Sequence, residues 1–298
     1  MRFAIAIEDK FDGVFHSLLV SGWTPVKVFT FPMNGRCAGA AVAAAAERLG
    51  VPVQLSRLEP GDLAALRAQA CETLVVAGYR WRIGDWTQHL RYAVNFHPSP
   101  LPDGRGPWPL VRALREGRKQ WGVSCHKLSP EFDQGAVLLK ERFDLAEDES
   151  HESLDLRCQM ALRRLAERLA QNLPAYWDKA KEQAPSDYWD FWTEEERALN
   201  LNGTVEQAQK QLRAFGLLGC TLKMGHGAVT VRRAVAWPES HAHAPGTLVH
   251  GNGRNLVFAL ADGYLGLTEW GESVKQVQAP ATPPPANPPP SPRGADPK

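Results

Sequence analysis

Residues 90–106 read LRYAVNFHPSPLPDGRG, a mostly apolar run followed by a loop with three prolines and two glycines. The apolar run from Leu90 to Phe96 predicts a β-strand. Residues two apart on a strand point to the same face, so Asn95 and His97 are expected to lie side by side at the carboxyl end of this strand. The stretch therefore places an amide and an imidazole at the edge of a sheet, against a proline-stiffened loop.

Short apolar runs alternate with helical patterns through the first half of the chain. The expected strands are RFAIAI (2–7), VKVFTF (26–31), VPVQL (51–55), TLVVAGY (73–79) and AVNF (93–96). The expected helices are DGVFHSLLVSG (12–22), AGAAVAAAAERLG (38–50) and PGDLAALRAQA (60–70). This alternation predicts an α/β fold with an open, mostly parallel, Rossmann-like sheet, in which ligands bind beyond the carboxyl ends of the strands. Asn95 and His97 lie at such an end.

Two further strands are expected to complete the sheet, WGVSCHKL (121–128) and AVLLKERF (136–143), separated by the turn SPEFDQG. A helix then starts after DES (148–150) and is interrupted or ended near Pro174. Its apolar stripe indicates core packing and consists of Leu154, Cys158, Leu162, Leu165, Leu169 and Leu173.

The rest of the chain predicts a second unit. We expect a catalytic domain over 1–183, a connector rich in aromatic and acidic residues over 184–202, and a small C-terminal domain over 203–278. Thr204 and Gln207 predict a capping box at the start of that domain. The short strands and glycine turns that follow predict a small β-barrel or sandwich, and we expect a barrel of the OB-like type. The proline-rich segment 279–298 is expected to be disordered.

Composition excludes several classes of protein. The chain has 298 residues, a formal net charge of +1 and five cysteines without a CxxC pair. The near-zero charge gives no general attraction to nucleic acid or to a membrane surface. The cysteine pattern argues for reduced thiols, and the amino terminus does not resemble a signal peptide. No apolar run reaches the roughly 20 residues of a membrane span. We expect a cytoplasmic protein; the sequence leaves its oligomeric state open.

Asp133 is the best candidate for a third polar group beside Asn95 and His97. The strand 121–128 is expected to run beside the Asn/His strand and to carry the Asp133 loop to the same edge. A carboxylate near a histidine holds its tautomer and can raise its pKa, and an amide can donate to an oxyanion. These groups together indicate acyl transfer. His126 is interpreted as a packed or supporting histidine and not as a catalyst.

No metal site is expected. The three histidines of HAHAPGTLVH lack a nearby acidic or cysteine partner with ligand spacing and are interpreted as part of a surface loop; they are His241, His243 and His250.

The segment NFHPSPLPDGRG followed by GVSCHKLSPEFDQGAVLL resembles the folate-dependent formyltransferase family. The family pattern is Asn-x-His-x-Ser-x-Leu-Pro, then Arg-Gly, then Gly-Val-Thr-x-His and an Asp-x-Gly-x-Ile/Leu loop. The resemblance covers roughly residues 1–180 and implies 10-formyltetrahydrofolate as the formyl donor. It also implies catalytic roles for Asn95, His97 and Asp133. Asn95 and His97 would stabilise the oxyanion, Asp133 would act as the base, directly or through a water, and His97 as the acid.

The resemblance further implies that the segment 75–84 and the FDQG loop flank the pteridine of the folate, largely through backbone groups. The donor-binding residues expected on this basis are Arg80, Trp81, Arg82, Ile83, Phe132, Gln134 and Gly135. Family members often have small or aliphatic residues where this chain has Arg80, Trp81 and Arg82. The two arginines either meet the glutamate tail of the folate or lie in solvent.

The C-terminal unit resembles the small barrel of methionyl-tRNA formyltransferases through TVEQAQKQLRAFG, APGTLVH and ALADGYLGL. Between Thr204 and Trp270, however, six basic residues face only four acidic ones: Lys210, Arg213, Lys223, Arg232, Arg233 and Arg254 against Glu206, Glu239, Asp262 and Glu269. A tRNA-binding surface is expected to be more basic, because phosphate neutralisation supplies most of such affinity.

We therefore expect formyl transfer to a primary amine of a non-tRNA acceptor: an amino sugar nucleotide, an amino acid derivative or a carrier-bound aminoacyl group. The main alternative is methionyl-tRNA, the one acceptor that would make a nucleic acid the partner. Hydrolysis of formyltetrahydrofolate is less favoured, because family hydrolases carry a further domain before the catalytic one. A catalytically silent nucleic-acid-binding protein is also less favoured, because all three polar residues are present.

Overall fold

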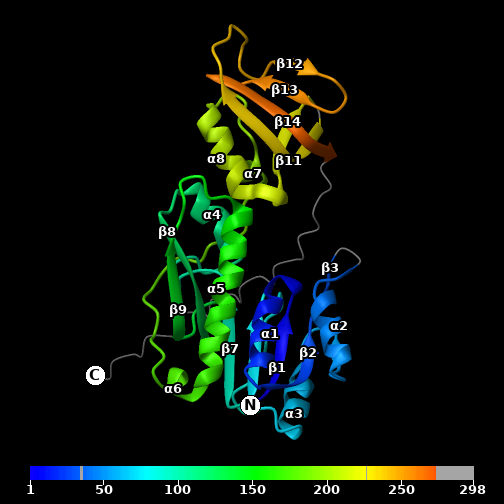
Figure 1. Ribbon diagram of the computed structural model, residues 1–298, viewed down its shortest axis with the longest axis vertical. Coiled ribbons are helices and arrows are strands. Elements are labelled where there is room, and N and C mark those ends of the chain that lie inside the picture. Colours follow the sequence, from blue (N-terminus) through cyan, green and yellow to red (C-terminus); the bar gives the residue numbers. More distant parts are fainter. Residues whose placement is uncertain (34–35, 226, 273–298) are drawn as a thin grey trace, which may run out of the picture.

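The structure, a computed structural model, describes residues 1–33, 36–225 and 227–272 (Figure 1). The proline-rich segment 279–298, expected to be disordered, and residues 273–278 of the expected C-terminal domain lie outside the described residues. Figure 1 shows two sheets at opposite ends of the molecule, with helices α7 (Glu194–Arg197) and α8 (Val205–Phe215) between them. Within the described ranges, no helix is both long enough and apolar enough to span a membrane.

The first sheet has seven strands in the order β5-β2-β1-β6-β7-β8-β9. Their bounds are β1 Arg2–Ile7, β2 Thr24–Phe29, β5 Val53–Gln54, β6 Thr73–Ala77, β7 Tyr92–His97, β8 Gln120–Lys127 and β9 Val137–Asp144. The pairs from β5 to β7 are parallel, whereas β8 and β9 are antiparallel to their neighbours. The predicted mixed α/β fold with a mostly parallel sheet is confirmed. A small hairpin, β3 (Pro32–Met33) and β4 (Arg36–Cys37), lies outside this sheet.

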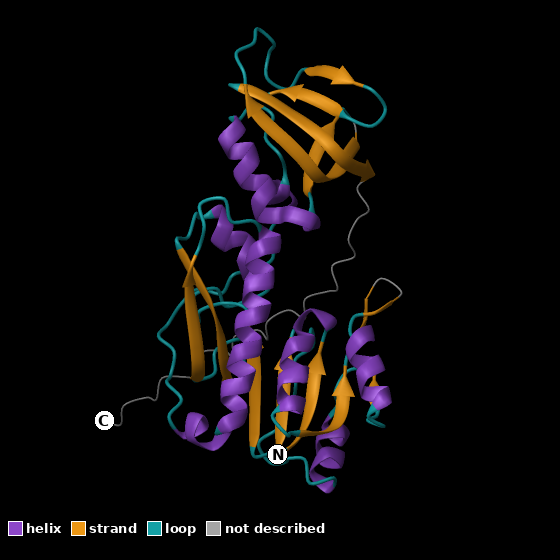
Figure 2. Ribbon diagram, in the orientation of Figure 1, coloured by secondary structure: helices purple, strands orange, loops and turns teal. Residues whose placement is uncertain are grey.

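Helices cover both faces of this sheet. Their bounds are η1 Asp9–Phe11, α1 Asp12–Val20, α2 Ala40–Arg48, α3 Pro60–Ala68, α4 Pro109–Arg115, α5 His151–Gln171 and α6 Leu173–Asp178. Figure 2 shows α1 and α5 on one face, where they pack on Phe3, Ile5 and Ile7 of β1 in one buried cluster. The alternate residues Ala4 and Ala6 belong to a second cluster with α3 on the other face. The helix starting at Ser150 ends before Pro174, as predicted.

The same alternation places the polar pair of β7. Val94 and Phe96 belong to the cluster under α1 and α5, whereas Ala93 belongs to the cluster under α3. Asn95 and His97 share the parity of Ala93, so they lie on the face opposite α5.

The second sheet is antiparallel, with the strand order β10-β11-β14-β13-β12. Its strands are β10 Cys220–Met224, β11 Gly227–Pro238, β12 Leu248–Gly251, β13 Leu256–Ala259 and β14 Gly263–Glu272; a short 3-10 helix, η2 (Gly216–Leu218), precedes them. Helix α8 covers one face, and Thr204 and Gln207 form the predicted capping box at its start.

The expected OB-like barrel is not found within the described ranges. A barrel needs a closed ring of paired strands, and there no pairing joins the edge strands β10 and β12. Apart from its pairing with β11, β10 has an isolated bridge from Thr221 to Ala198 of the connector. The C-terminal unit is thus an open antiparallel sheet packed on α8. Its apolar face is buried by this helix and by the connector, in a third cluster that includes Leu199, Phe215 and Leu265.

The connector 184–202 packs across the surface, as its aromatic residues predict. Trp189 is buried and stacks on Trp121 at 6.0 Å between ring centroids. Trp192 meets Phe215 of α8 edge-on at 5.3 Å. Tyr188, in contrast, remains 43% exposed. The connector therefore contacts both sheets, and our domain limits remain a prediction.

Candidate active site

The pairing of β7 with β8 places the Asp133 loop beside the polar pair. The two strands are antiparallel, with Asn95 opposite His126 and Val94 opposite Lys127. The expectation that β8 carries the loop to the carboxyl edge needs correction, because an antiparallel strand runs away from that edge. β8 ends level with Val94, and the loop that follows folds back over Asn95.

The fold-back brings all three predicted catalytic residues into contact. Oδ1 of Asp133 lies 3.5 Å from Nδ1 of His97 and accepts from Nδ2 of Asn95 at 3.3 Å. Oδ2 of Asp133 accepts from the backbone N–H of Gly106 at 2.9 Å. Asp133 itself has a left-handed backbone with φ of 57°. A non-glycine residue in this region is uncommon and requires support from its surroundings.

His126 fixes the amide of Asn95. Its Nδ1 lies 2.8 Å from the carbonyl oxygen of Lys127, which can only accept, so Nδ1 carries the proton. Nε2 of His126 then accepts from Nδ2 of Asn95 at 3.0 Å. Because His126 is 1% exposed, the amide is held by a buried and fully used imidazole. The structure thus gives His126 a contact with Asn95 that the sequence did not predict.

The protonation of His97 follows from its partners. Nε2 lies 2.8 Å from the carbonyl oxygen of Gly104 and must donate to it, which leaves the lone pair of Nδ1 facing Asp133. Burial lowers the pKa of His97 below its ordinary value, and the nearby Asp133 carboxylate only partly opposes this. His97 is therefore a neutral imidazole with a free acceptor nitrogen at neutral pH.

Asp133 is ionised. Burial alone would raise the pKa of its carboxyl, but the imidazoles of His97 and His126, when protonated, and the N–H of Gly106 outweigh burial and lower the pKa to about 2. The site thus combines an ionised carboxylate, a neutral imidazole and an oriented amide. These are the groups that acyl transfer requires for proton movement and for oxyanion stabilisation.

The two segments expected to bind the donor lie next to each other. The guanidinium of Arg82 lies 5.0 Å from the ring centroid of Phe132, and its Nη2 lies 3.1 Å from Oε2 of Glu131. Trp81 meets Tyr79 edge-on at 5.4 Å. The guanidinium of Arg80 lies 5.7 Å from the Trp81 ring. The two arginines therefore already have aromatic and acidic partners within the protein.

The remaining expected donor residues differ in exposure. Ile83 packs against the second buried cluster, and Gln134 is exposed. Gly135 is buried, and a Cβ at this position would lie 1.9 Å from the carbonyl oxygen of Lys127. Only glycine fits there, so the sharp return of the loop depends on Gly135.

Two residues in contact with Asp133 were not singled out from the sequence. Gly106 was visible only as part of an Arg-Gly pair in the motif. Gln183, whose Nε2 donates to the carbonyl oxygens of Asp133 and Gly135, carries no sequence signal at all. It directly precedes the connector, far along the chain from the motif.

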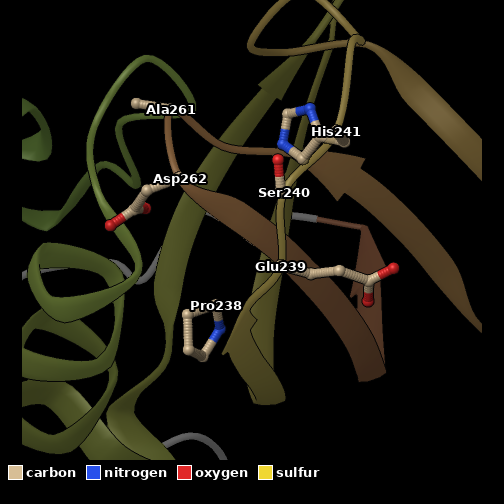
Figure 3. A pocket seen from close by; sticks show the side chains of 6 residues that line it. All are labelled: Pro238, Glu239, Ser240, His241, Ala261 and Asp262. Carbon is tan, nitrogen blue, oxygen red and sulfur yellow. The ribbon is translucent and has the colours of Figure 1, made fainter.

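A separate hollow on the second sheet does not resemble a catalytic site. Figure 3 shows the carboxylates of Glu239 and Asp262 pointing in opposite directions. Each is already used within the protein: Glu239 accepts from the indole of Trp237 at 2.8 Å and Asp262 from the N–H of Val205 at 2.8 Å. In the part of the chain that the structure describes, no group of three or more His, Cys, Asp or Glu side chains is arranged to hold a metal ion.

Comparisons with known proteins identify the family of this chain. The sequence profile of the family described as Formyl transferase matches residues 38–166. The methionyl-tRNA formyltransferase of Herpetosiphon aurantiacus is 32% identical over 243 residues, which span 76% of this chain and 77% of that protein. The corresponding enzyme of Halorhodospira halophila is 30% identical over 269 residues, or 85% of each chain. The chain therefore belongs to the folate-dependent formyltransferase family, whose members are enzymes that transfer a formyl group from a folate.

Solved structures share the fold at lower identity. HypX from Aquifex aeolicus, in complex with tetrahydrofolic acid, superimposes with a TM-score of 0.66 at 19% identity over 92% of this chain. This chain spans 45% of HypX. The N-formyltransferase of Helicobacter canadensis, in complex with folinic acid and dTDP-3-aminofucose, gives a TM-score of 0.61 at 12% identity, over 91% of this chain and 99% of the other. At these identities the likeness establishes the fold alone.

Proposed function

We propose that this chain transfers the formyl group of 10-formyltetrahydrofolate to a primary amine on a non-tRNA acceptor, with Asn95, His97 and Asp133 as the catalytic residues. The contact of these three side chains at one sheet edge is the observation that supports the catalytic assignment. An amino sugar nucleotide, an amino acid derivative and a carrier-bound aminoacyl group all present the required amine.

In this proposal the amine nitrogen attacks the formyl carbon. A C–N bond forms and the carbonyl electron pair moves to oxygen. The bond to N10 of the folate then breaks, N10 keeps the electron pair and gains a proton, and the amine nitrogen loses one. The reaction therefore balances without a further reactant.

Asn95 is the proposed oxyanion donor. Its amide uses both N–H groups in this structure, at 3.0 Å to His126 and at 3.3 Å to Asp133. We propose that the longer bond is exchanged for one to the formyl oxygen, while His126 keeps the amide oriented. One such donor is worth on the order of 3 kcal/mol in the transition state.

His97 is the proposed proton carrier. The sequence favoured Asp133 as the base, directly or through a water, but in this structure its carboxylate accepts from Asn95 and from the N–H of Gly106. The free Nδ1 of His97 suits that role better. It would take the proton of the amine and return it to N10, while Asp133, at 3.5 Å, stabilises the imidazolium in between.

The segments 80–83 and 132–135 are the proposed walls of the donor site. They include Arg80, Trp81, Arg82 and Ile83 on one side and Phe132, Gln134 and Gly135 on the other, and the Arg82–Phe132 contact joins them. Phe132 is 38% exposed, and Gln134 is exposed as well. Their side chains offer an apolar surface and an amide to the flat pteridine ring of the folate.

The charge of the C-terminal unit supports a non-tRNA acceptor. Only two more basic than acidic residues lie between Thr204 and Trp270 (six against four). One of the six, Arg233, already pairs with Glu269, at 3.3 Å. The resulting net charge of +2 (six minus four) is small for a surface that would have to neutralise several phosphates.

Methionyl-tRNA is the second candidate acceptor. The relatives that are 30% and 32% identical over most of this chain are methionyl-tRNA formyltransferases. This observation favours the tRNA, whereas the charge balance opposes it.

Salt dependence separates the two acceptors. We would measure formyl transfer to small amines and to methionyl-tRNA, together with tRNA binding, across roughly 50 to 200 mM salt, where multi-phosphate binders lose orders of magnitude in affinity. The proposal expects transfer to a small amine with little salt dependence, and weak tRNA binding. Tight, steeply salt-dependent tRNA binding with formylation of methionyl-tRNA would establish the alternative.

A further inference from the structure

Gln183, which directly precedes the connector, contacts the loop of Asp133. Its Nε2 donates to the carbonyl oxygen of Asp133 at 2.8 Å and to that of Gly135 at 2.7 Å. Its Oε1 accepts from Nε of Arg105 at 3.3 Å and from Nη2 at 3.2 Å. The half-buried amide thus uses both of its N–H groups and its oxygen.

The chemistry of these partners requires an amide. Two carbonyl oxygens can only accept, and a guanidinium can only donate, so the side chain between them must donate on one side and accept on the other. A carboxylate of the same size accepts from Arg105 but has no N–H for the loop. Of the residues with this reach, glutamine satisfies both partners.

Arg105 closes the connection to the carboxylate of Asp133. It is 7% exposed, and its guanidinium also donates to the carbonyl oxygens of Ala184 and Ser186. The next residue, Gly106, donates its N–H to Oδ2 of Asp133. Two sets of hydrogen bonds therefore fix Asp133: Gly106 bonds its side chain and Gln183 bonds its backbone. Arg105 links the two, because it precedes Gly106 in the chain and donates to Gln183.

The backbone conformation of Asp133 explains why it needs hydrogen bonds to both its side chain and its backbone. Its φ of 57° costs on the order of 1–3 kcal/mol for a non-glycine residue. Without the hydrogen bonds from Gln183, the turn from Asp133 to Gly135 loses two of the contacts that oppose this strain. The carboxylate would then leave its place beside His97.

We infer that Gln183 is a positioning residue that keeps the Asp133 carboxylate against His97, an inference that rests on the proposed function for its kinetic part. Gln183 contacts neither the amine nor the folate in this account; it acts through the backbone of the Asp133 loop.

Two substitutions distinguish a role of Gln183 in positioning the Asp133 carboxylate from a role in supporting the connector alone. Gln183→Ala removes all four hydrogen bonds. Gln183→Glu keeps the oxygen that Arg105 contacts, and adds an ion pair there, but lacks the N–H groups that hold the loop. The matched control is Gln209→Ala, which removes a side-chain amide bonded at 2.8 Å to the carbonyl oxygen of Ala236 on the second sheet.

We expect both Gln183 variants to lower kcat at least tenfold, and Gln209→Ala to leave kcat unchanged. An NMR titration of the ring of His97, which needs no substrate, supplies a second readout. A displaced carboxylate stabilises the imidazolium less, so the pKa of His97 should fall in Gln183→Ala, which adds no charge of its own.

Wild-type kcat in Gln183→Glu would show that the residue only supports Arg105, and an unchanged His97 titration would overturn the positioning role. The titration result does not depend on whether the acceptor has been found. Absence of formyl transfer by the wild-type protein to every amine would instead refute the proposed function and leave the titration result standing.

Discussion

The backbone N–H of Gly106 donates to Oδ2 of Asp133 at 2.9 Å, across 27 residues of sequence. Gly106 has φ of 107°, and a Cβ there would lie 2.2 Å from the carbonyl oxygen of Trp189. The proline-rich loop, the Asp133 loop and the connector therefore meet at a position that only glycine can occupy.

Replacement of Gly106 by alanine should disturb all three segments. We expect Gly106→Ala to lower the free energy of unfolding by on the order of 1–3 kcal/mol, because of backbone strain and the clash with Trp189. Turnover should fall at least tenfold, because the backbone N–H that donates to the Asp133 carboxylate moves. Gly61→Ala in α3 is the control: no atom lies within 4 Å of the added Cβ. Urea unfolding and kcat of both variants check this prediction, and equal results for the two would contradict it.

Removal of the proposed catalytic groups should affect turnover more than donor binding. Asn95→Ala, His97→Ala and Asp133→Ala should each lower kcat by roughly 100-fold or more, the scale for loss of an oxyanion donor or a general acid–base group. The Kd for the folate should change little, because the proposed donor contacts lie on the neighbouring segments. Steady-state kinetics with equilibrium binding of tetrahydrofolate gives both quantities. Near-wild-type turnover in any variant would remove that residue from the mechanism.

The titration of His97 should depend on Asp133. Burial lowers the pKa of His97 and the carboxylate raises it, so loss of the carboxylate in Asp133→Asn should lower the pKa further. NMR titration of the His97 ring measures this, with exposed His16 of α1 as the internal control. A higher pKa in Asp133→Asn would mean that the carboxylate does not face the imidazole as described.

Glu8 should make the stability of the fold depend on pH. Burial raises the pKa of its carboxyl from 4.5 to about 7, despite the opposing charge of Lys10. Between these values the folded state binds more protons than the unfolded state, so stability falls as pH rises through this window. A shift of this size corresponds to about 3 kcal/mol.

Glu8→Gln should remove that loss. The free energy of unfolding of the variant minus that of wild type should be larger at pH 8 than at pH 4.5. Urea unfolding at both pH values measures this difference. The exposed Glu72→Gln is the control and should show no such difference. If Glu8→Gln changed the free energy of unfolding equally at both pH values, the prediction that Glu8 is buried and uncharged near pH 5 would be wrong.

Period-two alternation and the family motif predicted much of the site. Asn95 and His97 could be predicted to share a face because the apolar run before them identifies a strand, and Asp133 because its loop completes the motif. The direction of β8 could not be predicted, because a strand buried on both faces has the same apolar pattern in parallel and antiparallel pairing. The fold-back of the Asp133 loop follows from that direction.

Contacts made to backbone groups could not be predicted from the sequence. Gln183 binds two carbonyl oxygens, and any residue supplies a carbonyl, so no pattern in the chain marks it. The open second sheet was predicted as a barrel because short strands and glycine turns are common to both arrangements, and only the pairing of edge strands distinguishes them.

We propose formyl transfer from the folate to an amine at the Asn95–His97–Asp133 site. The most direct measurement follows tetrahydrofolate and formylated amine together, with 10-formyltetrahydrofolate and a panel of primary amines, in wild type and in His97→Ala. We predict that wild type releases the two products in equal amounts, only when a suitable amine is present, and that His97→Ala releases neither at a comparable rate. Release of tetrahydrofolate at the same rate without any amine would contradict the claim and identify a hydrolase.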